Sequence, residues 1–479
     1  MGVVSTELTC LDATQLASKI RSKAISPVEV AQAHLQRIEA MNPRLNAIVT
    51  PNPFFMDEAR AAEEAVMSGI ALGPLHGVPF TIKDCIDTRG LRTTRGSKLF
   101  SNHVPTADAT VVTRLRRAGG IFIGKTNMPE FALWWETDNV VFGRTVNPWN
   151  HERTPGGSSG GEAAAIVSGM SPLGMGSDLG GSIREPANYC GIIGLKPTHG
   201  RVPLTGHWPD TLLRFMHVGP LARSVRDIAL SLSVVAGPDG RDPYAIPVES
   251  YKPTKPTPDL AGMRVGWTTD GPFAPAASSV KKVVASAANA LAELGCTVEE
   301  VALDSMIRED PQRISDAVYA TEGRHYLDPL IRGREHELAP SMQRRLGLPL
   351  PTQQDYLDAV ESLERLKAGF LTLWDRHDLL LCSAGLVPAH PHDQNPLVVE
   401  GQQMAGRNAL RATIPFDLTG SPAISVPFGW STDGLPIGVQ LVGRHFDEDT
   451  VLRAAAALET LHGQPCKRLN LNGSHSRAS

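Results

Sequence analysis

The chain is organised around the stretch PGGSSGGEAAAIVSGMSPLGMGSDLGGSIR, which spans residues 155–184. Its first glycine- and serine-rich cluster covers 156–161, and its second is Gly180-Gly181-Ser182. Glycine is costly to order, and it serves where the backbone takes a positive φ or approaches a ligand closely. Two such clusters, joined by one helix-length segment, predict a site built from backbone amides and hydroxyl groups.

The composition is that of an ordinary globular protein. Of the 479 residues, 42% are hydrophobic and 20% are charged, and the formal net charge is -4 without a long run of one sign. A nucleic-acid-binding protein would instead concentrate basic residues on one face, so we expect no nucleic-acid partner. No apolar run is long enough to span a bilayer, and the N-terminus lacks the pattern of a secretory signal, so we expect no membrane association. The six cysteines form no CxxC pair, which is typical of a reducing cytoplasm, the location we expect.

Short apolar runs that alternate with helical segments predict an α/β fold. Residues 78–84 and 121–125 have the composition of buried strands, and 263–298 has that of a strand–helix–strand unit. Lys83 closes the first of these runs. A buried lysine is rare unless it is paired or functional, and the alternative is a strand-end lysine whose amine reaches water.

The central stretch does not fit the common glycine-rich motifs. A phosphate-binding loop requires GxxxxGK[ST] and a dinucleotide fold requires GxGxxG, and neither pattern occurs here. Residues 156–160 satisfy GxSxG literally, but a nucleophile elbow needs a strand directly before its serine. Prolines within 147–155 exclude a central strand there, because proline removes a donor from the ladder. A serine hydrolase with a lysine base is the remaining hypothesis.

On these residues the sequence resembles the amidase signature family, serine amidohydrolases with a Ser–cis-Ser–Lys triad. The resemblance is carried by GVPFTIKD (77–84), PGGSSGGEAAA (155–165), GSDLGGSIREPANYCGIIGLKPT (176–198), TGSPAISVP (419–427) and GLPIGVQLVGR (434–444). It implies one compact α/β domain with a large mixed, mostly parallel twisted sheet that is flanked by helices on both faces.

The resemblance sets this domain at residues 1–465, followed by a polar tail at 466–479. The expected parts of the domain are, in order, an N-terminal helical segment (7–70), a catalytic core (71–235), a strand–helix region (260–300), a helical insertion (305–376) and C-terminal sheet strands with a closing helix (377–465).

Carried over position by position, the resemblance implies that Ser182 is the nucleophile, Ser158 the bridging serine after a cis peptide bond, and Lys83 the general base. The chemistry of these side chains agrees. A serine hydroxyl needs an adjacent base, and a lysine accepts a proton only when burial keeps it neutral. Ser158 can pass the proton on because a hydroxyl both donates and accepts.

The resemblance also assigns residues around the triad. Backbone N–H groups of the second cluster would stabilise the oxyanion, where the loss of one donor typically costs ~3–4 kcal/mol. This expected oxyanion hole consists of Leu179, Gly180, Gly181 and Ser182. Three further residues, Ser159, Asp178 and Arg184, are expected to support the site.

The sequence determines the substrate less closely than it determines the type of reaction. The family includes enzymes for aliphatic, aryl, fatty and peptide amides and for carbamates, and also the glutaminase subunit of tRNA-dependent amidotransferases. That subunit normally carries Asp and Gln just before the Gly-Pro that corresponds to Gly219-Pro220. This chain instead has the apolar and aromatic segment Phe215-Met216-His217-Val218 there. No cationic anchor for the carboxylate of a free amino acid is evident from the sequence.

We therefore expect a stand-alone amidase that resembles aryl acylamidases or carbamate hydrolases and cleaves small apolar or aryl amides, carbamates or esters. Trp134, Trp135, Trp208 and Phe215 are expected to line its pocket. The alternative is the glutaminase subunit. The expected partners are a small-molecule amide and water, with no cofactor and no metal, and a homo-oligomer is left open.

Overall fold

The computed structural model describes residues 7–247, 251, 259–270 and 275–463. Its centre is an eleven-stranded sheet with the strand order β1-β3-β2-β4-β6-β5-β12-β13-β9-β7-β8. The polar tail expected at 466–479 lies outside the described residues. The strands are β1 (Ile48–Pro51), β2 (Pro79–Lys83), β3 (Ile121–Thr126), β4 (Leu173–Asp178), β5 (Ile193–Lys196), β6 (His217–Ala222), β7 (Arg264–Trp267), β8 (Thr297–Glu300), β9 (Leu379–Ser383), β12 (Ala423–Trp430) and β13 (Pro436–Gly443).

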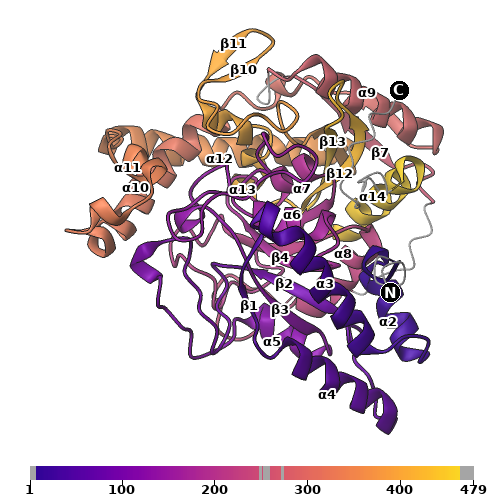
Figure 1. Ribbon diagram of the computed structural model, residues 1–479. Helices are drawn as coiled ribbons and strands as arrows, with labels where there is room; N and C mark the ends of the chain where they lie inside the picture. The colour runs from indigo at the N-terminus through magenta and orange to yellow at the C-terminus, as the bar shows by residue number, and fades with distance from the viewer. Residues whose placement is uncertain (1–6, 248–250, 252–258, 271–274, 464–479) are drawn as a thin grey trace.

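Helices surround this sheet, and a small hairpin of β10 (Leu397–Val399) and β11 (Gln402–Met404) stands apart from it (Figure 1). The helices are α2 (Ala13–Arg21), α3 (Pro27–Leu45), α4 (Phe55–Ser68), α5 (Thr110–Arg117), α6 (Gly160–Val167), α7 (Arg184–Cys190), α8 (Val225–Val235), α9 (Ser278–Glu293), α10 (Pro311–Ile331), α11 (Pro340–Leu346), α12 (Gln353–Arg376), α13 (Ile414–Thr419) and α14 (Glu448–His462). No helix in the described ranges is long and apolar enough to cross a membrane.

Both faces of the sheet are covered, as β6 shows. Successive side chains of a strand point to opposite faces. Val218 and Ala222 of β6 pack in the core cluster that contains α8, whereas Leu221 packs with α6 and α7. The predicted α/β fold, with one mixed sheet flanked by helices, is therefore confirmed.

The expectation that most strands are parallel is corrected by the pairing. Among the described residues, four strand pairs are parallel (β2–β3, β2–β4, β7–β8 and β7–β9). The other six pairs in the large sheet are antiparallel. Antiparallel strands need only a short turn, whereas parallel strands need a long crossover. The five-residue turn 431–435 between β12 and β13 permits such a hairpin in the C-terminal part of the sheet.

The segment between the two glycine-serine clusters is also not one helix. It contains α6 and then the buried strand β4, between β2 and β6. Glycines in β4 leave room for the helix above it: a Cβ at Gly174 would collide with the Glu162 carboxylate, and one at Gly176 would lie 2.8 Å from Ser159 Oγ. Their low strand propensity hides β4 from a pattern-based reading.

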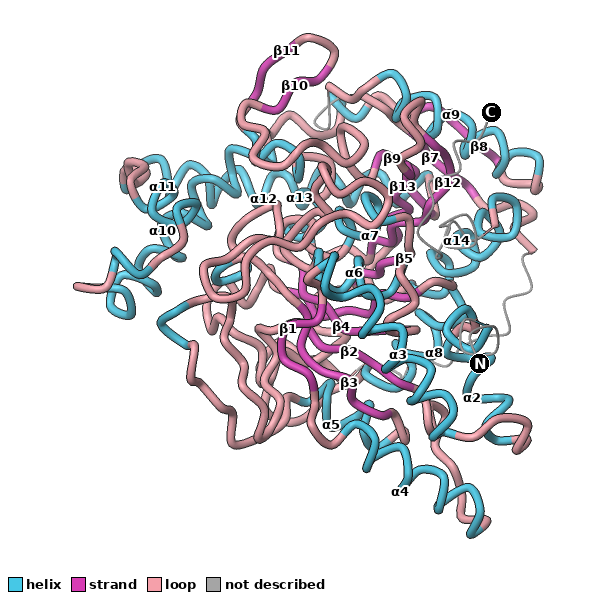
Figure 2. Tube along the Cα trace, in the orientation of Figure 1, coloured by secondary structure: helices cyan, strands magenta, loops and turns pink. Residues whose placement is uncertain are grey.

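The region 305–376 is helical, as expected, and it contains α10, α11 and α12. These helices project to one side of the sheet, away from α2–α4 (Figure 1). Long loops fill much of the space between this helical region and strands β1–β4 (Figure 2). The candidate site lies where α10 and these loops meet the ends of β2 and β4.

Candidate active site

Lys83 is the last residue of β2, a strand whose residues are all buried. Its side chain has no exposed surface. The Nζ atom lies 2.7 Å from Ser158 Oγ and 3.1 Å from Ser177 Oγ, and it donates to the Ser177 carbonyl at 3.3 Å. The lysine at the end of the apolar run is thus held by hydroxyl and carbonyl oxygens rather than by a carboxylate.

This environment lowers the pKa of Lys83 to about 8, from an ordinary value of 10.5. Burial is the largest cause, because it disfavours the charged amine. The electrostatic influence of Cys85, Asp178 and Glu162 opposes the shift. At pH 7 a group with this pKa is roughly one-tenth neutral, so a proton-accepting form of Lys83 is present.

Ser158 belongs to the first cluster, and the Gly157–Ser158 peptide bond is cis, as the resemblance implies. The Gly157 N–H donates to Glu185 Oε2 at 3.0 Å. A side chain at Gly157 would clash with the backbone between Trp134 and Glu136, with contacts of 2.7–2.8 Å. Glycine is therefore required here because two backbone segments pass one another closely.

Ser182 lies in the tight connection between β4 and α7. Asp178, the last residue of β4, organises this connection: its carboxylate accepts the N–H of Gly181 at 2.6 Å and that of Ile183 at 3.0 Å. Gly181 has φ +131°, a conformation that favours glycine. The Ser182 carbonyl accepts the N–H of Ser159 at 3.1 Å. The structure thus brings the two glycine-serine clusters together.

Arg184 connects this loop to the C-terminal part of the sheet. Its buried guanidinium donates to two carboxylates: to both oxygens of Asp178 at 3.0 Å and to Asp417 Oδ2 at 2.6 Å. It also donates to the Thr413 carbonyl and to Gln440 Oε1, each at 2.8 Å. Asp178 and Arg184 therefore support the loop around Ser182, as expected. The nearby Ser159 Oγ donates to the Ser177 carbonyl at 3.4 Å.

The charges in this cluster follow from burial and pairing. Burial alone would raise the pKa of Asp178, but the Arg184 guanidinium and the hydrogen bonds outweigh it and hold this pKa well below its usual range. Burial would likewise lower the pKa of Arg184, and the two carboxyl groups hold it above its ordinary value. Burial is the main reason that the pKa of Asp417 is raised, and the charge of Asp178 adds to the effect.

The expected oxyanion hole needs one correction. The Gly181 N–H donates to Asp178 and is not free for a substrate oxygen. In the described part of the chain, the N–H groups of Gly180 and Ser182 donate to no acceptor. The neighbouring carbonyls are fixed, because the Gly180 carbonyl accepts from Thr413 Oγ1 at 2.6 Å and the Leu179 carbonyl from Tyr319 Oη at 3.0 Å. The candidate donors are therefore Leu179, Gly180 and Ser182.

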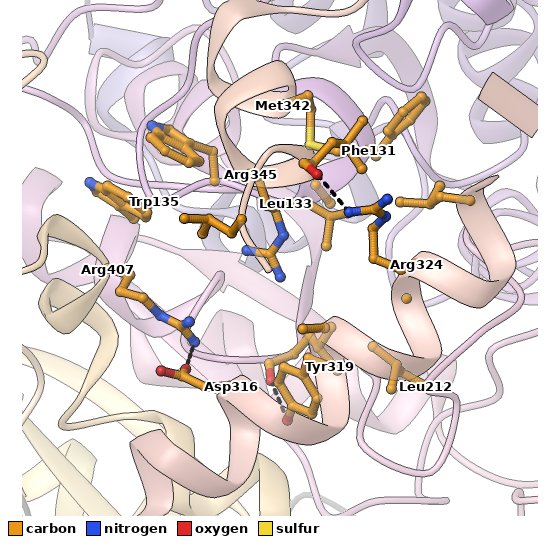
Figure 3. A pocket seen from close by; sticks show the side chains of 18 of the residues that line it. Phe131, Leu133, Trp135, Leu212, Asp316, Tyr319, Arg324, Met342, Arg345 and Arg407 are labelled. Carbon is orange, nitrogen blue, oxygen red and sulfur yellow. Dashed lines mark hydrogen bonds and ion pairs between the residues drawn. The ribbon is translucent and has the colours of Figure 1, made fainter. Parts of the chain in front are cut away.

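A cavity of about 680 Å³ opens onto Ser158, Ser177 and Ser182. Its lining is largely aliphatic and aromatic, with Phe131, Leu133, Leu212, Tyr319 and Met342 among the residues that Figure 3 labels. Trp134 and Trp135 line the cavity, and their rings stack at a centroid distance of 3.8 Å.

The other two aromatic residues expected in the pocket do not line it. Trp208 is buried behind the wall, where it packs against Phe131 at a ring distance of 5.1 Å. Phe215 is buried against Tyr319 at 5.6 Å. Both lie in the connection 197–216 between β5 and β6. The sequence of a loop does not show which of its side chains face a cavity.

The sequence also failed to indicate the arginines of this cavity. The lining includes Arg324, whose Nη1 donates to the Leu346 carbonyl at 2.7 Å, and Arg407, which forms an ion pair with Asp316. Arg345 points into the cavity (Figure 3), and its guanidinium has no hydrogen-bond or ion-pair partner within the described ranges. These arginines come from the helical insertion and η6 (Gly406–Leu410), far in sequence from the glycine-rich stretch.

Ser177 is a further residue that the sequence did not single out. It holds Lys83 through its hydroxyl and carbonyl groups. Recognition of β4 as a strand would have placed Ser177 at the same sheet edge as Lys83, because β2 and β4 are parallel neighbours.

Comparison with known proteins agrees with this geometry. The family model for amidases matches residues 29–452. One similar protein is a glutamyl-tRNA(Gln) amidotransferase subunit from Moorella thermoacetica, which is 36% identical over 482 residues. The matched region covers 95% of this chain and 97% of that protein.

Solved structures of similar fold include 6-aminohexanoate cyclic dimer hydrolase complexed with substrate, which is 31% identical in sequence. The two structures superimpose with a TM-score of 0.85, and the match covers 97% of this chain and 99% of that one. A bacterial aryl acylamidase of the amidase signature family is 27% identical with a TM-score of 0.87 and coverage of 96% and 98%. The protein therefore belongs to the amidase family, and it is an amidohydrolase of carbon–nitrogen bonds.

Proposed function

We propose that this protein hydrolyses small apolar or aryl amides through an acyl-enzyme on Ser182. The observation that carries the proposal is the 2.7 Å contact between Lys83 Nζ and Ser158 Oγ at a cavity that also exposes Ser182. A buried lysine with a lowered pKa can act as a base, and the hydroxyl next to it can transfer a proton to it.

The proposed reaction begins when neutral Lys83 accepts the proton of Ser158, which in turn accepts the proton of Ser182. Ser182 Oγ attacks the carbonyl carbon, and the negative oxygen is stabilised by the N–H groups of Leu179, Gly180 and Ser182. The C–N bond then breaks as the relay returns the proton to the leaving amine. Water loses a proton to the same relay and attacks the ester, which releases the carboxylic acid and restores Ser182.

The cavity supports the choice of an apolar substrate. Its volume of about 680 Å³ and its aromatic wall of Trp134, Trp135 and Phe131 suit a bulky apolar or aryl group. Carbamates and esters present a similar carbonyl and fit the same proposal. Similarity to an aryl acylamidase and to 6-aminohexanoate cyclic dimer hydrolase points to a stand-alone hydrolase.

A glutaminase subunit of an amidotransferase is the second candidate. The similarity to the Moorella amidotransferase protein along almost the whole chain favours it. So does Arg345, because a guanidinium that lines a cavity and has no partner among the described residues is a suitable partner for a carboxylate. The residues before Gly219-Pro220 argue against it: Met216 and Val218 are buried apolar side chains, and the lining is mostly apolar.

Kinetic comparison of a substrate panel tests the proposal. Purified protein and a Ser182→Ala variant are assayed with 4-nitroacetanilide and longer acyl anilides, aryl carbamates, alkyl amides and glutamine. The proposal predicts turnover of an anilide or carbamate that the variant loses. Ammonia release from glutamine without anilide turnover, or only after a partner subunit is added, would replace it with the amidotransferase candidate.

A further inference from the structure

Gly323 is a buried glycine in the middle of α10 that lines the cavity. Beyond its chain neighbours and the backbone of its own helix, a Cβ built on Gly323 meets no heavy atom of the described residues within 4 Å. A residue that is buried and yet has empty space beside its Cα borders an internal void. The void beside Gly323 is therefore part of the cavity, and any side chain at this position would enter it.

Helix formation does not explain a glycine at this position. Glycine is less favourable in a helix interior than every residue except proline. Gly323 has no left-handed φ, and no backbone or side chain from the described parts of other elements would come within 4 Å of an added Cβ. At Gly369 of α12, by contrast, an added Cβ would lie 2.5 Å from the Met306 carbonyl oxygen, so packing accounts for that glycine. The open space itself is the feature that distinguishes Gly323.

The void lies close to the reacting groups. Tyr319, four residues before Gly323, donates through its hydroxyl to the Leu179 carbonyl at 3.0 Å, next to the Ser182 loop. Residues four apart lie on the same face of a helix, about 6 Å apart along its axis. A group bound next to Gly323 is thus about one helical turn beyond the point where α10 touches the Ser182 loop.

The cavity differs in character on the two sides of Tyr319. Toward the start of α10, the wall carries the ion pair between Asp316 and Arg407, with Trp135 nearby (Figure 3). Toward its end, Gly323 is followed by Leu327, which packs in one buried cluster with Phe131 and Met342. The side that Gly323 opens is therefore mainly apolar, although Arg324 and Arg345 border it.

The apolar side continues to the outer edge of the cavity. The loop between α11 and α12 contributes Leu348 and Leu350, which are 64% and 50% exposed. Its start is held by Arg324, which donates to the Leu346 carbonyl at 2.7 Å. The exposed leucines provide apolar surface for a group too long to be enclosed completely.

We propose that Gly323 determines specificity: its missing side chain keeps open an apolar channel that runs along α10 from the Ser182 loop toward Leu348 and Leu350. The corresponding substrates are amides in which one substituent is an elongated alkyl or arylalkyl group. This inference rests on the proposed function, because it assumes that the amide reacts at Ser182. It adds to that function the shape of the substrate and the residue that limits its length.

Filling the channel tests the inference. Gly323→Leu places a branched side chain in the void, and Gly323→Ala adds a single methyl group. The matched control is His325→Leu, which introduces the same side chain at an exposed position of the same helix. Values of kcat/KM are measured for two series: 4-nitroanilides with acyl chains of increasing length, and acetamides with N-alkyl chains of increasing length.

In one of the two series, kcat/KM of the unaltered protein should rise roughly two- to fourfold for each added methylene. Gly323→Leu should remove this rise and lower kcat/KM for an eight-carbon chain at least tenfold, while the shortest substrate stays within twofold. Gly323→Ala should give an intermediate result and His325→Leu none. A rise in neither series, an equal loss for short and long chains, or an unchanged rise in Gly323→Leu would overturn the inference.

A binding measurement separates this inference from the proposed function. Calorimetry with Ser182→Ala and with Ser182→Ala/Gly323→Leu reports, without turnover, the affinities for two eight-carbon compounds: the 4-nitroanilide with an eight-carbon acyl chain and the acetamide with an eight-carbon N-alkyl chain. Tight binding of either compound to the first protein and at least tenfold weaker binding of that compound to the second support the channel even when no amide is hydrolysed. Equal affinities of the two proteins for both compounds would overturn the channel even when hydrolysis occurs. The melting temperatures of both proteins verify that Gly323→Leu leaves the fold intact.

Discussion

The Lys83 amine lies 2.7 Å from the hydroxyl of Ser158, a residue 75 positions away in the sequence. Lys83 has no exposed surface, and Ser158 keeps only 1% of its own. Because the lysine is shielded from water, its proton affinity falls, and because Ser158 stands beside it, a proton can travel between them. This buried pair is the centre of the proposed relay, and the loop around Ser182 and the cavity are built beside it.

The pH dependence of activity should report the neutral form of Lys83. Its folded-state pKa is lowered to about 8, so the neutral fraction rises with pH and levels off above that value. We expect kcat/KM for a neutral anilide to rise about tenfold per pH unit below pH 7 and to reach a plateau near pH 9. Lys83→Arg should show no such activity, because a guanidinium stays charged.

A control variant distinguishes the titration of Lys83 from that of a nearby carboxyl group as the cause of the rise in kcat/KM with pH. Burial raises the pKa of Glu162 to about 7, so it titrates in the same range. If kcat/KM of Glu162→Gln still rises with pH in the same range, the rise is assigned to Lys83. Loss of the rise in that variant, in which Lys83 is intact, would contradict the assignment.

The loop around Ser182 should depend strongly on Arg184. Removal of one partner from a buried ion pair typically costs ~3–5 kcal/mol, because an uncompensated charge remains. Arg184→Ala leaves Asp178 buried without its guanidinium, so we expect a loss of that size in the free energy of unfolding. Arg365→Ala is the matched control: Arg365 is 56% exposed in its pair with Glu309, and such pairs contribute ~0–1 kcal/mol. Urea denaturation of both variants checks the difference, and equal losses would refute the structural role of Arg184.

Arg345 should discriminate between substrates by charge. Its guanidinium has no partner among the described residues and points into the cavity. Hydrogen bonds to charged groups contribute ~1.5–3 kcal/mol, so Arg345→Met should raise KM for a carboxylate-bearing amide roughly ten- to a hundredfold. The KM of a neutral amide of similar size should change less than threefold. An equal change in KM for both substrates would show that Arg345 does not discriminate between substrates by their charge.

Two tryptophans should respond differently to truncation. Trp134 is half-buried in the lining of the cavity, whereas Trp208 is 5% exposed and packs behind its wall. Trp208→Ala should lower the free energy of unfolding by ~3–5 kcal/mol, the usual cost of deleting a buried ring. Trp134→Ala should change KM for aryl amides more than it changes stability. Thermal denaturation and anilide kinetics on both variants test this, and a stability loss as large in Trp134→Ala would contradict the assignment.

The sequence predicted the class of fold and much of its framework because those signals are local. The apolar run ending at Lys83, the strand at 121–125 and the strand–helix–strand unit at 263–298 all appear in the structure. It missed β4 because Gly174 and Gly176 lower strand propensity, although they are needed to admit Glu162 and Ser159. Pairing direction was also missed, because it depends on neighbours that are distant in the chain.

In the candidate site, too, the sequence predicted what local motifs determine and missed what depends on distant neighbours. The motifs placed Lys83, Ser158 and Ser182, and the structure brings the first two into contact and all three to one edge of the sheet. Gly181 was misassigned because the sequence does not show that its N–H is taken by Asp178. Arg345 and Gly323 were not found, because a helical pattern shows which positions share a face but not what that face meets.

The most direct test of the account is to trap the acyl-enzyme. The protein is mixed with a 4-nitrophenyl ester, quenched in acid and digested, and the modified peptide is sequenced by tandem mass spectrometry. Ser158→Ala should slow the labelling, since it removes the relay but keeps the nucleophile. The account predicts that the acyl group is attached to Ser182. An acyl group on Ser158 would contradict it, as would an unlabelled protein that still hydrolyses the ester.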